Sequence, residues 1–513
     1  MPGRGVGLTN SQLRASDIGV SLGANTVGAF GQVLVVEEDP IFHEYVVRLA
    51  DPRVWTQYTL LGGSATANGQ TAVGTVSSGA TQYAYGVAQT SATVPYTPGR
   101  GVTVRFTASF DAAGVASSFV AVGPYHGESG LGVGYNGTAW GMFHRYGRRF
   151  EVQKFTLTAA ASGSETATVT LNGTAHAVAI TSGTVEQNAR ELAEDDNYAD
   201  SGGLVQWEAW AVGDTVYFIR QATGDAPGTM SYSSTGTSAA TVSEFQQGAD
   251  GTQTWTPQAS FDDPLDGTGP SGITLDVTKL NIYEFRYGWL GSLSPELYVF
   301  GSDGKPYLVH RVPWNGANTI PWCADPRFPV TYSAASLGST TNVTASGASV
   351  TAIQHGKTAV QGPRFPPQVA SATDLGSSAL IPVLSIQTSP LDVALSAINR
   401  RRLLVTSIVV EAMGSKDLEI AVRLGDPSNL TGYEFAQPNN NSPLWVESSA
   451  TAWTGTAIEE LRQEVVASGT AAEIKFDPPI AVERSEVLTI LAQGLSSGAG
   501  SDVFVVINGF EDH

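Results

Sequence analysis

The sequence predicts a mainly β protein, with two antiparallel, jelly-roll-like β-sandwich domains and a small inserted ββαββ module. Two observations favour this fold class. Runs of β-branched and aromatic residues recur at short intervals, separated by clusters of Gly, Ser, Thr and Pro, as in sandwich strands and turns. Charged residues make up only 14% of the chain, against roughly 25% in soluble domains, which suits smooth β surfaces and surfaces buried in assemblies. With 513 residues the chain is expected to form several domains.

An N-terminal attachment arm is expected over residues 1–39. Glycine and small polar residues dominate this stretch, which holds one short apolar run, from Val33 to Val36. An exposed arm of this composition is ordinarily poorly ordered unless something ties it down. We therefore expect it to be held against a partner, such as another subunit.

A discontinuous β-sandwich is expected over residues 40–150 and 248–334. The first block contains the runs YVVRLA, GVTVRFTASF and ASSFVAVGPY, and the second contains ITLDVTKLNIYEFRYGWLG and ELYVFGSDGKPYLVHRV. Because both blocks have the same strand spacing, they are expected to complete one jelly-roll-like domain together. In the second block, the turn Ser302-Asp303-Gly304-Lys305 is predicted to join two strands of a hairpin.

An α+β module is expected between these blocks, over residues 151–247. Two strands, ATVTLNG and AHAVAI, meet at Asn172-Gly173, the strongest short hairpin signal in the sequence. A helix is predicted in TVEQNARELAE, where Thr184 and Gln187 have capping-box spacing and the apolar residues share one face. The segment WEAWAVGDTVYFIRQ supplies two further strands, which completes the ββαββ order.

A linker is expected over residues 335–378, because this stretch is rich in Ser, Thr, Gly and Pro and shows little periodicity. A second β-sandwich is expected over residues 379–513. Its strands are predicted in the runs LIPVLSIQ, RRLLVTSIVVEAM, LEIAVRL, AEIKFDPPI, EVLTILAQG and DVFVVINGF.

Charge balance and apolar patterning weigh against several function classes. With 27 basic and 47 acidic residues, the net charge is −20, which opposes binding to nucleic acid phosphates. No run approaches the roughly 18 apolar residues that a membrane-spanning helix needs, so membrane insertion is not expected. The N-terminal residues lack the apolar segment of a signal peptide, so synthesis in a cytoplasm is expected. The single cysteine, Cys323, is expected to be a packed side chain.

Acidic residues in predicted loops are the most enzyme-like feature. They are Glu128, in PYHGE, and Asp262, Asp263 and Asp266, in FDDPLDGTG. Paired carboxylates could serve glycoside hydrolysis, one as the acid and the other as nucleophile or base. Loop acids are also common turn formers, which is the favoured interpretation. The three aspartates are in addition a candidate Ca²⁺ site, although the segment lacks the terminal Glu of an EF-hand loop.

The other motifs predict no cofactor. The seven histidines show no zinc-type spacing, the Gly-rich strings GVGYNG and GLGVG lack the Lys-Ser/Thr pair of a phosphate loop, and no GxSxG motif occurs. On these grounds the chain is not expected to be an enzyme.

Two sets of side chains are candidates for contact with a glycan or a partner: Trp55, Trp314 and Trp322 at predicted loop tips, and Arg400, Arg401 and Arg402 before a strongly β segment. The indole rings could stack on sugars, although large aromatic residues in sandwiches are more often core or interface residues. The arginines could bind an acidic partner surface or a neighbouring subunit; the alternative is a solvated strand start.

Several stretches resemble a known family. GLGVGYNGTAWGMFHRYGRRFEVQKFTLT, TATVTLNGTAHAVAITSGTVEQNARELAE and AWAVGDTVYFIRQATGDAPGTMSY resemble, in this order, a module of virion structural proteins from tailed phages and large DNA viruses. DPLDGTGPSGITLDVTKLNIYEFRYGWLGSLSPELYVF and KPYLVHRVPW resemble the rest of that module. FDPPIAVERSEVLTILAQGLSSGAGSDVFVVING resembles the β-sandwich that often ends such proteins. The resemblance covers most of residues 125–330 and, more loosely, 390–513.

This resemblance implies a virion protein, made in the host cytoplasm and displayed on the capsid as a head-associated spike, decoration or fibre protein. It implies no catalytic residues. Other virion proteins of the capsid or tail would be partners through the N-terminal arm, copies of the chain would associate, and a host surface glycan is a possible ligand. Two alternatives stay open: a tail fibre or receptor-binding protein with lectin-like carbohydrate binding, and a polysaccharide depolymerase.

Overall fold

The computed structural model describes residues 38–512, except for positions 95–99, 196, 204, 289–292, 356–363, 378, 393–395, 400, 426, 434, 439–441, 455–456, 458, 483–485 and 497–500. Within these residues the protein is mainly β, with antiparallel sheets arranged as sandwiches and one α-helix, so the predicted fold class is confirmed. The expected arm lies outside the described residues apart from its last two positions. Among the described residues, no helix combines the length and the apolar character that crossing a membrane requires.

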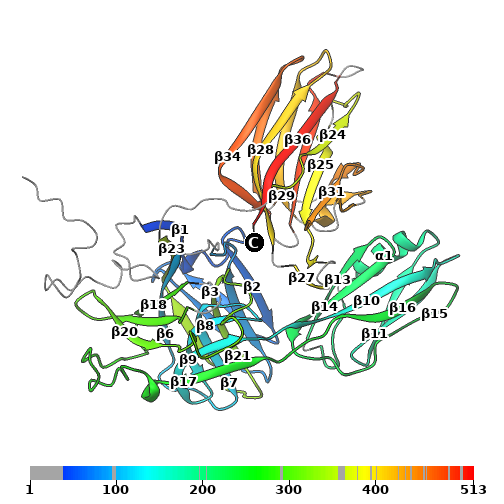
Figure 1. The fold of residues 1–513 in the computed structure, drawn as a ribbon. Coiled ribbons are helices and arrows are strands. Elements are labelled where there is room, and N and C mark those ends of the chain that lie inside the picture. The colour runs from blue at the N-terminus through cyan, green and yellow to red at the C-terminus, as the bar shows by residue number, and fades with distance from the viewer. Residues whose placement is uncertain are drawn as a thin grey trace, which may run out of the picture.

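The N-terminal sandwich consists of two large sheets (Figure 1). The nine-stranded sheet has the order β20 (Pro306–Arg311), β19 (Glu296–Phe300), β18 (Asn281–Gly288), β6 (Gly101–Phe110), β22 (Thr344–Gly347), β4 (Val73–Ser77) and β3 (Ser64–Asn68), and β23 (Ser349–His355) pairs with both β6 and β1 (Glu38–Tyr45). The seven-stranded sheet has the order β17 (Thr252–Pro257), β9 (Ala139–Tyr146), β8 (Gly130–Asn136), β7 (Ser118–Pro124), β21 (Val330–Ser336), β5 (Tyr85–Thr90) and β2 (Trp55–Leu60).

Strands from both sequence blocks are interleaved in this sandwich. β18 pairs with β6 along its whole length, and β21 lies between β5 and β7. Alternate residues of these strands point into a common core, where the ring of Phe106 stacks on Tyr283 and Phe285 at centroid distances of 5.8 and 6.2 Å. The core is therefore closed only when segments far apart in the sequence pair.

The segment 335–378, expected to be a linker, contains three strands instead. β22 and β23 belong to the nine-stranded sheet, and β24 (Gln368–Ala372) belongs to the C-terminal sandwich. The inward positions of β22 and β23 carry small residues such as Ala345 and Ala352, both fully buried. A Cβ on Gly347 would lie 2.3 Å from the hydroxyl of Tyr332, so a larger residue does not fit there. Because tight packing requires small residues at these inward positions, the alternation of large apolar and polar residues that predicts a strand is weak here.

The inserted module is itself a small sandwich. The expected order of two strands, a helix and two strands is present in β11, β12, α1, β13 and β14, and three further strands complete the sheets. One sheet has the order β13 (Trp207–Val212), β14 (Thr215–Thr223), β10 (Phe150–Ala159) and β16 (Ala239–Gln246); the other has β12 (Thr174–Ile180), β11 (Glu165–Leu171) and β15 (Ser231–Ser234), and the helix is α1 (Val185–Ala193).

Local signals in the module and in the second block are confirmed. Asn172 and Gly173 have φ values of 48° and 82°, the left-handed conformation that a tight hairpin requires. The side chain of Thr184 accepts a hydrogen bond from the backbone N–H of Gln187 at 3.2 Å and caps α1. At the predicted turn between β19 and β20, Gly304 has a φ of 76°.

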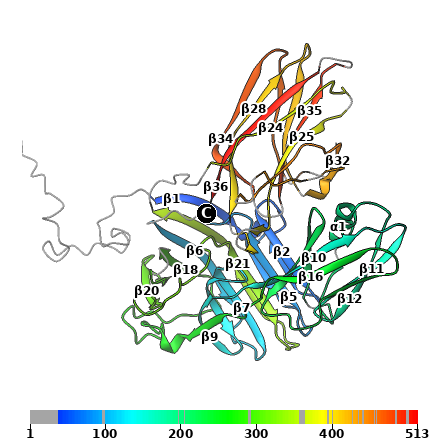
Figure 2. The same ribbon diagram turned by 45° about the vertical axis from the view of Figure 1, so that its right-hand side comes forward.

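The C-terminal sandwich stands above the other two domains (Figures 1 and 2). One sheet has the order β24, β36 (Val503–Asp512), β28 (Arg402–Ala412) and β34 (Ala471–Val482). The other has β31 (Leu444–Glu447), β25 (Ile381–Thr388), β35 (Val487–Gly494), β29 (Leu418–Gly425) and β33 (Glu459–Val466). Two short pairs accompany them: β26 (Leu391–Asp392) with β27 (Ala397–Ile398), and β30 (Leu430–Thr431) with β32 (Ala452–Trp453).

A buried carboxylate, Glu165, holds one end of the module together. It accepts hydrogen bonds from the backbone N–H groups of Ser162, Thr237 and Ser238 at 3.2, 2.7 and 3.0 Å. The hydroxyl of Ser234 donates to it at 2.7 Å. These bonds, with those from Ser238 and Thr237 first, hold the pKa of Glu165 well below its ordinary value of 4.5.

Because the folded state lowers this pKa, Glu165 stabilises the module at pH values above about 4.5, and this contribution is lost as the pH falls further. We predict that thermal unfolding of the Glu165→Gln variant changes less between pH 7 and pH 3 than that of the wild type. Glu208→Gln, at a side chain that bonds the exposed Gln221 at 3.0 Å, is the matched control and should keep the wild-type pH dependence. Equal pH dependence in wild type and Glu165→Gln would contradict the assignment.

Candidate functional site

A short hairpin, here called the clip, connects the C-terminal sandwich to the inserted module. The clip consists of β26 and β27. Its buried side chains Leu391 and Ile398 pack against Tyr217 and Ile219 on the outer face of the module's four-stranded sheet. The backbone N–H of Ile398 donates to the side-chain oxygen of Gln246 at 3.0 Å. The clip thus covers an apolar sheet face that belongs to another domain.

Arg401 holds the clip to the C-terminal sandwich. Its guanidinium lies 2.7 Å from a carboxylate oxygen of Asp392, in the clip, and 3.2 Å from one of Glu511, in β36. The two carboxylates are each 8% exposed and the arginine side chain is 16% exposed. The hydroxyl of Ser442 donates to the other oxygen of Glu511 at 2.5 Å. These charges are therefore paired with one another inside the chain.

Arg402, the next residue, contacts the N-terminal sandwich. The contacts of the clip, Arg401 and Arg402 are together called the joint. The side chain of Arg402 is buried, and Nη1 lies 3.5 Å from the hydroxyl of Thr93. Arg400 lies outside the described residues. Arg401 therefore lies between the clip and β36 of its own domain, and Arg402 lies next to the N-terminal sandwich. Contact of these arginines with an acidic partner surface stays a prediction.

The three candidate tryptophans are core side chains. Trp55, Trp314 and Trp322 are 1%, 4% and 0% exposed, and each indole N–H donates to a backbone carbonyl. His144 packs against Trp314 and Trp322, and burial lowers the pKa of this histidine to about 4. Stacking on a sugar needs an exposed ring face. The expected glycan contact through these tryptophans is therefore corrected to a packing role.

Asp263 is a buried turn former. It is 2% exposed, and its two carboxylate oxygens accept hydrogen bonds from the backbone N–H groups of Leu265 at 3.2 Å and Ser271 at 2.8 Å. The carboxylate thus accepts hydrogen bonds from loop N–H groups that a backbone carbonyl would otherwise accept. The sequence interpretation of this loop acid as a turn former is confirmed for Asp263.

Asp262 accepts a hydrogen bond from strand β20, whereas Asp266 accepts its bonds within the loop. The side chain of Asp262 is 63% exposed and accepts a hydrogen bond from the backbone N–H of Arg311 at 3.0 Å. Asp266 accepts bonds from the hydroxyl and the backbone N–H of Thr268, which lower the pKa of Asp266. Across the described part of the chain, no group of three His, Cys, Asp or Glu residues is placed to hold a metal ion. The candidate Ca²⁺ site at Asp262, Asp263 and Asp266 is thus not supported.

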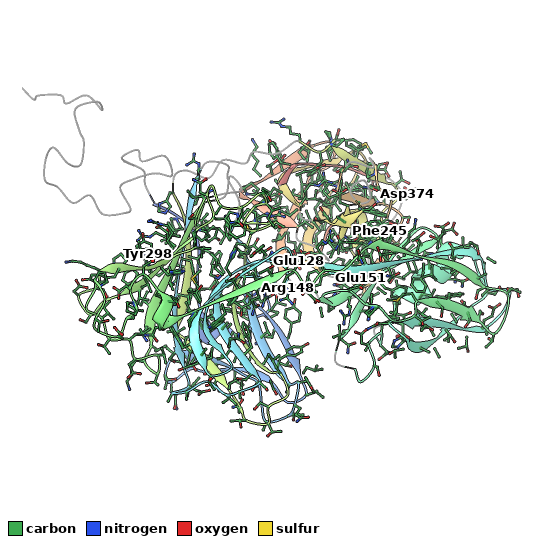
Figure 3. The ribbon with its side chains drawn as sticks, turned by 60° about the horizontal axis from the view of Figure 1, so that its bottom comes forward. Glu128, Arg148, Glu151, Phe245, Tyr298 and Asp374 are labelled. Carbon is green, nitrogen blue, oxygen red and sulfur yellow. The ribbon has the colours of Figure 1, made fainter. Side chains whose placement is uncertain are left out.

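Glu128 and Asp263 do not form an open carboxylate pair. Glu128 is 4% exposed, and its backbone N–H donates to the ring of His126 at 3.2 Å. Figure 3 labels Glu128, together with Arg148 and Glu151 from the segment where the chain passes from the N-terminal sandwich into the inserted module. Two-carboxylate hydrolysis needs both acids to reach a substrate. Burial of both side chains offers no such access.

Sequence reasoning missed a charged cluster on the outer face of the nine-stranded sheet. Glu284 has a fully buried side chain between the guanidiniums of Arg105, at 2.6 Å, and Arg286, at 2.5 Å. The Arg286 guanidinium lies 3.9 Å from the ring centroid of Tyr298, a side chain that Figure 3 labels. Alternate charges in the run YEFRYG were a signal for Glu284 and Arg286. Arg105 could not be added, because the pairing of β18 with β6 is not visible in sequence.

The comparisons with known proteins give little. No family model matches the chain, and no curated protein matches it. Among solved structures, one titled "Life in the extremes: atomic structure of Sulfolobus Turreted Icosahedral Virus" aligns over 92% of this chain and 95% of its own, with 8% identity and a TM-score of 0.15. One titled "The Triple Jelly Roll Fold and Turret Assembly in an Archaeal Virus" aligns over 94% and 98%, with 7% identity and a TM-score of 0.15. At this TM-score, neither match carries an argument about this chain.

We predict that Arg401→Ala destabilises the C-terminal sandwich by about 3–5 kcal/mol, because two buried carboxylates then lose their shared cation. Urea unfolding of the full chain measures this. The matched control is Arg423→Ala, which removes a partly exposed pair with Glu460 at 3.2 Å and should cost below about 1 kcal/mol. Equal losses in both variants would contradict the role of Arg401.

Asp263→Ala should destabilise the N-terminal sandwich by about 2 kcal/mol or more, because two backbone N–H groups lose their acceptor in a buried loop. Asp262→Ala, at the exposed neighbour, is the control and should cost about 1 kcal/mol or less. Thermal unfolding of both variants provides the measurement. If the two substitutions have the same effect, the turn-forming assignment fails.

Proposed function

We propose that this chain is a structural protein of a virus particle, displayed on the capsid as a spike, decoration or fibre, with no catalytic activity. The sequence resemblance described above supports this proposal. The observation that carries it is the joint made by the clip, Arg401 and Arg402. The clip packs on the inserted module, Arg401 pairs with Asp392 and Glu511, and Arg402 lies 3.5 Å from the hydroxyl of Thr93 in the N-terminal sandwich. Such a joint fixes the relative position of domains, which is the requirement of an assembly component.

The candidate ligand-binding side chains are also engaged within the fold. Asp263 and Glu128 are buried, and the three tryptophans donate to backbone carbonyls. This distribution favours the structural role over the depolymerase and lectin-like alternatives. Whether the chain belongs to the head or to the tail of the particle would be decided by locating it on the particle.

Particles purified from the producing host test the proposal. Mass spectrometry of density-purified particles should detect this chain in a fixed ratio to the major coat protein, and an abundant host protein serves as the control for carry-over. Detection of the chain in the lysate but not in the particles would contradict a virion role.

The proposed partners are other virion proteins, reached through residues 1–39. A chain that lacks residues 1–37 should keep the wild-type unfolding temperature and lose incorporation into particles, because the first described strand, β1, begins at Glu38. Incorporation at the wild-type level would contradict attachment through the arm.

A further inference from the structure

One corner of the N-terminal sandwich is built from two stretches that contain no charged residue. The chain has no Asp, Glu, Lys, Arg or His between Val54 and Val94, and none between Phe328 and Gln354. In the fold, these two stretches supply neighbouring strands: β22 pairs with β4, and β21 pairs with β5. Distant parts of a chain with 14% charged residues and a net charge of −20 thus combine into one uncharged region.

Three of the loops at this corner lie at positions 61–63, 78–84 and 337–343. The second loop is tied to the third by hydrogen bonds from the N–H of Ser78 to the carbonyl of Val343 at 3.1 Å and from the N–H of Gly79 to the side-chain oxygen of Asn342 at 2.8 Å. A Cβ on Gly79 would lie 2.5 Å from the carbonyl oxygen of Gly62, so the first and second loops are in direct contact. The loops therefore form one continuous surface.

Three large apolar side chains are exposed on these loops: Leu61 (46% exposed), Tyr83 (51%) and Leu337 (55%). Tyr58 (50%) is exposed on the adjoining edge strand β2. We call the three loops and these four side chains the uncharged tip. Leu61 and Tyr83 have φ values of 51° and 62°, in the left-handed region that favours glycine. Strain of this kind persists where the surroundings or the function require the side chain. Two bulky, strained and exposed residues on adjoining loops indicate a contact surface.

The strands beside the tip are unprotected sheet edges. β2 and β3 end their respective sheets, and the residues of β2 from Thr56 to Thr59 are exposed. Soluble proteins commonly protect such edges with charged residues or proline, and neither β2 nor β3 contains either. Asp111, at the border of the region, is held by the N–H and hydroxyl of Thr344 at 2.7 and 2.9 Å.

We propose that the uncharged tip is the surface through which two copies of this chain associate. Each copy has a net charge of −20, so copies repel one another in most orientations. Contact between two tips brings no charges together, and a two-fold contact matches the same patch to itself. Depletion of charge and enrichment in tyrosine are also features of the buried centres of protein interfaces.

Sedimentation equilibrium of the full chain tests the proposal. The wild type should form dimers, and the double variant Tyr58→Asp/Leu337→Asp should raise the dimer dissociation constant by about tenfold or more. Val465→Asp, at a 62% exposed valine of the C-terminal sandwich, is the matched control and should leave dimerisation unchanged. A wild type that stays monomeric, or a control with the same effect as the double variant, overturns the proposal.

A second variant separates association from folding. Leu61→Gly/Tyr83→Gly removes two contact side chains and also relieves the backbone strain at both positions, so it should weaken the dimer without lowering the unfolding temperature of the diluted monomer. Unchanged dimerisation of this variant would contradict the proposal.

Salt provides an independent readout. Raising the salt concentration from about 0.01 M to about 1 M shortens the Debye length from about 30 Å to about 3 Å. This screens the repulsion between copies, so the dimer should become tighter, whereas an interface of paired charges would become weaker. Weakening by salt overturns the proposal. A chain that dimerises through the tip but is absent from particles would contradict only the proposed function.

Discussion

The contact between the C-terminal sandwich and the inserted module depends on the clip, which the ionic contact of Arg401 with Asp392 and Glu511 holds in place. These carboxylates are buried, so each would carry a large desolvation cost without a cation beside it. Arg401 neutralises the clip and the last strand of the chain at once, and this holds Ile398 in reach of the side chain of Gln246. The apolar contact between clip and module follows from this placement. The joint thus combines the ion pairs of Arg401, which hold the clip, with the apolar contact of the clip on the module.

Local features were predictable because their causes are local. Asn172-Gly173 adopts a tight turn, and Thr184 caps α1, because the residues that determine each feature are close in sequence. The alternation of apolar residues gave the fold class for the same reason. The strands of β22 and β23 were missed, since alanine at inward positions removes the alternation on which a strand prediction depends.

Candidate site residues were harder to predict, because their roles depend on burial and on pairing across long sequence distances. Trp314 and Arg401 are residue types that often contact ligands or partners. In the fold, Trp314 donates to a backbone carbonyl in the core, and Arg401 pairs with Asp392, 9 positions away, and Glu511, 110 positions away. Asp263 was correctly interpreted as a turn former, since its acceptors serve residues two and eight positions away. The uncharged tip was predictable only in part. The sequence shows that its stretches lack charged residues, but only the fold shows that these stretches form one surface.

Hydrogen exchange at the clip tests the central claim, that buried contacts fix the C-terminal sandwich to the inserted module. The backbone N–H of Ile398 donates to Gln246, and that of Asn399 donates to the carbonyl of Pro390 at 2.9 Å. The account predicts that both amides exchange as slowly as those in the central strands of the sheets. Exchange at the rate of an open loop, with the sheets still protected, would show that the domains move independently and would contradict the account.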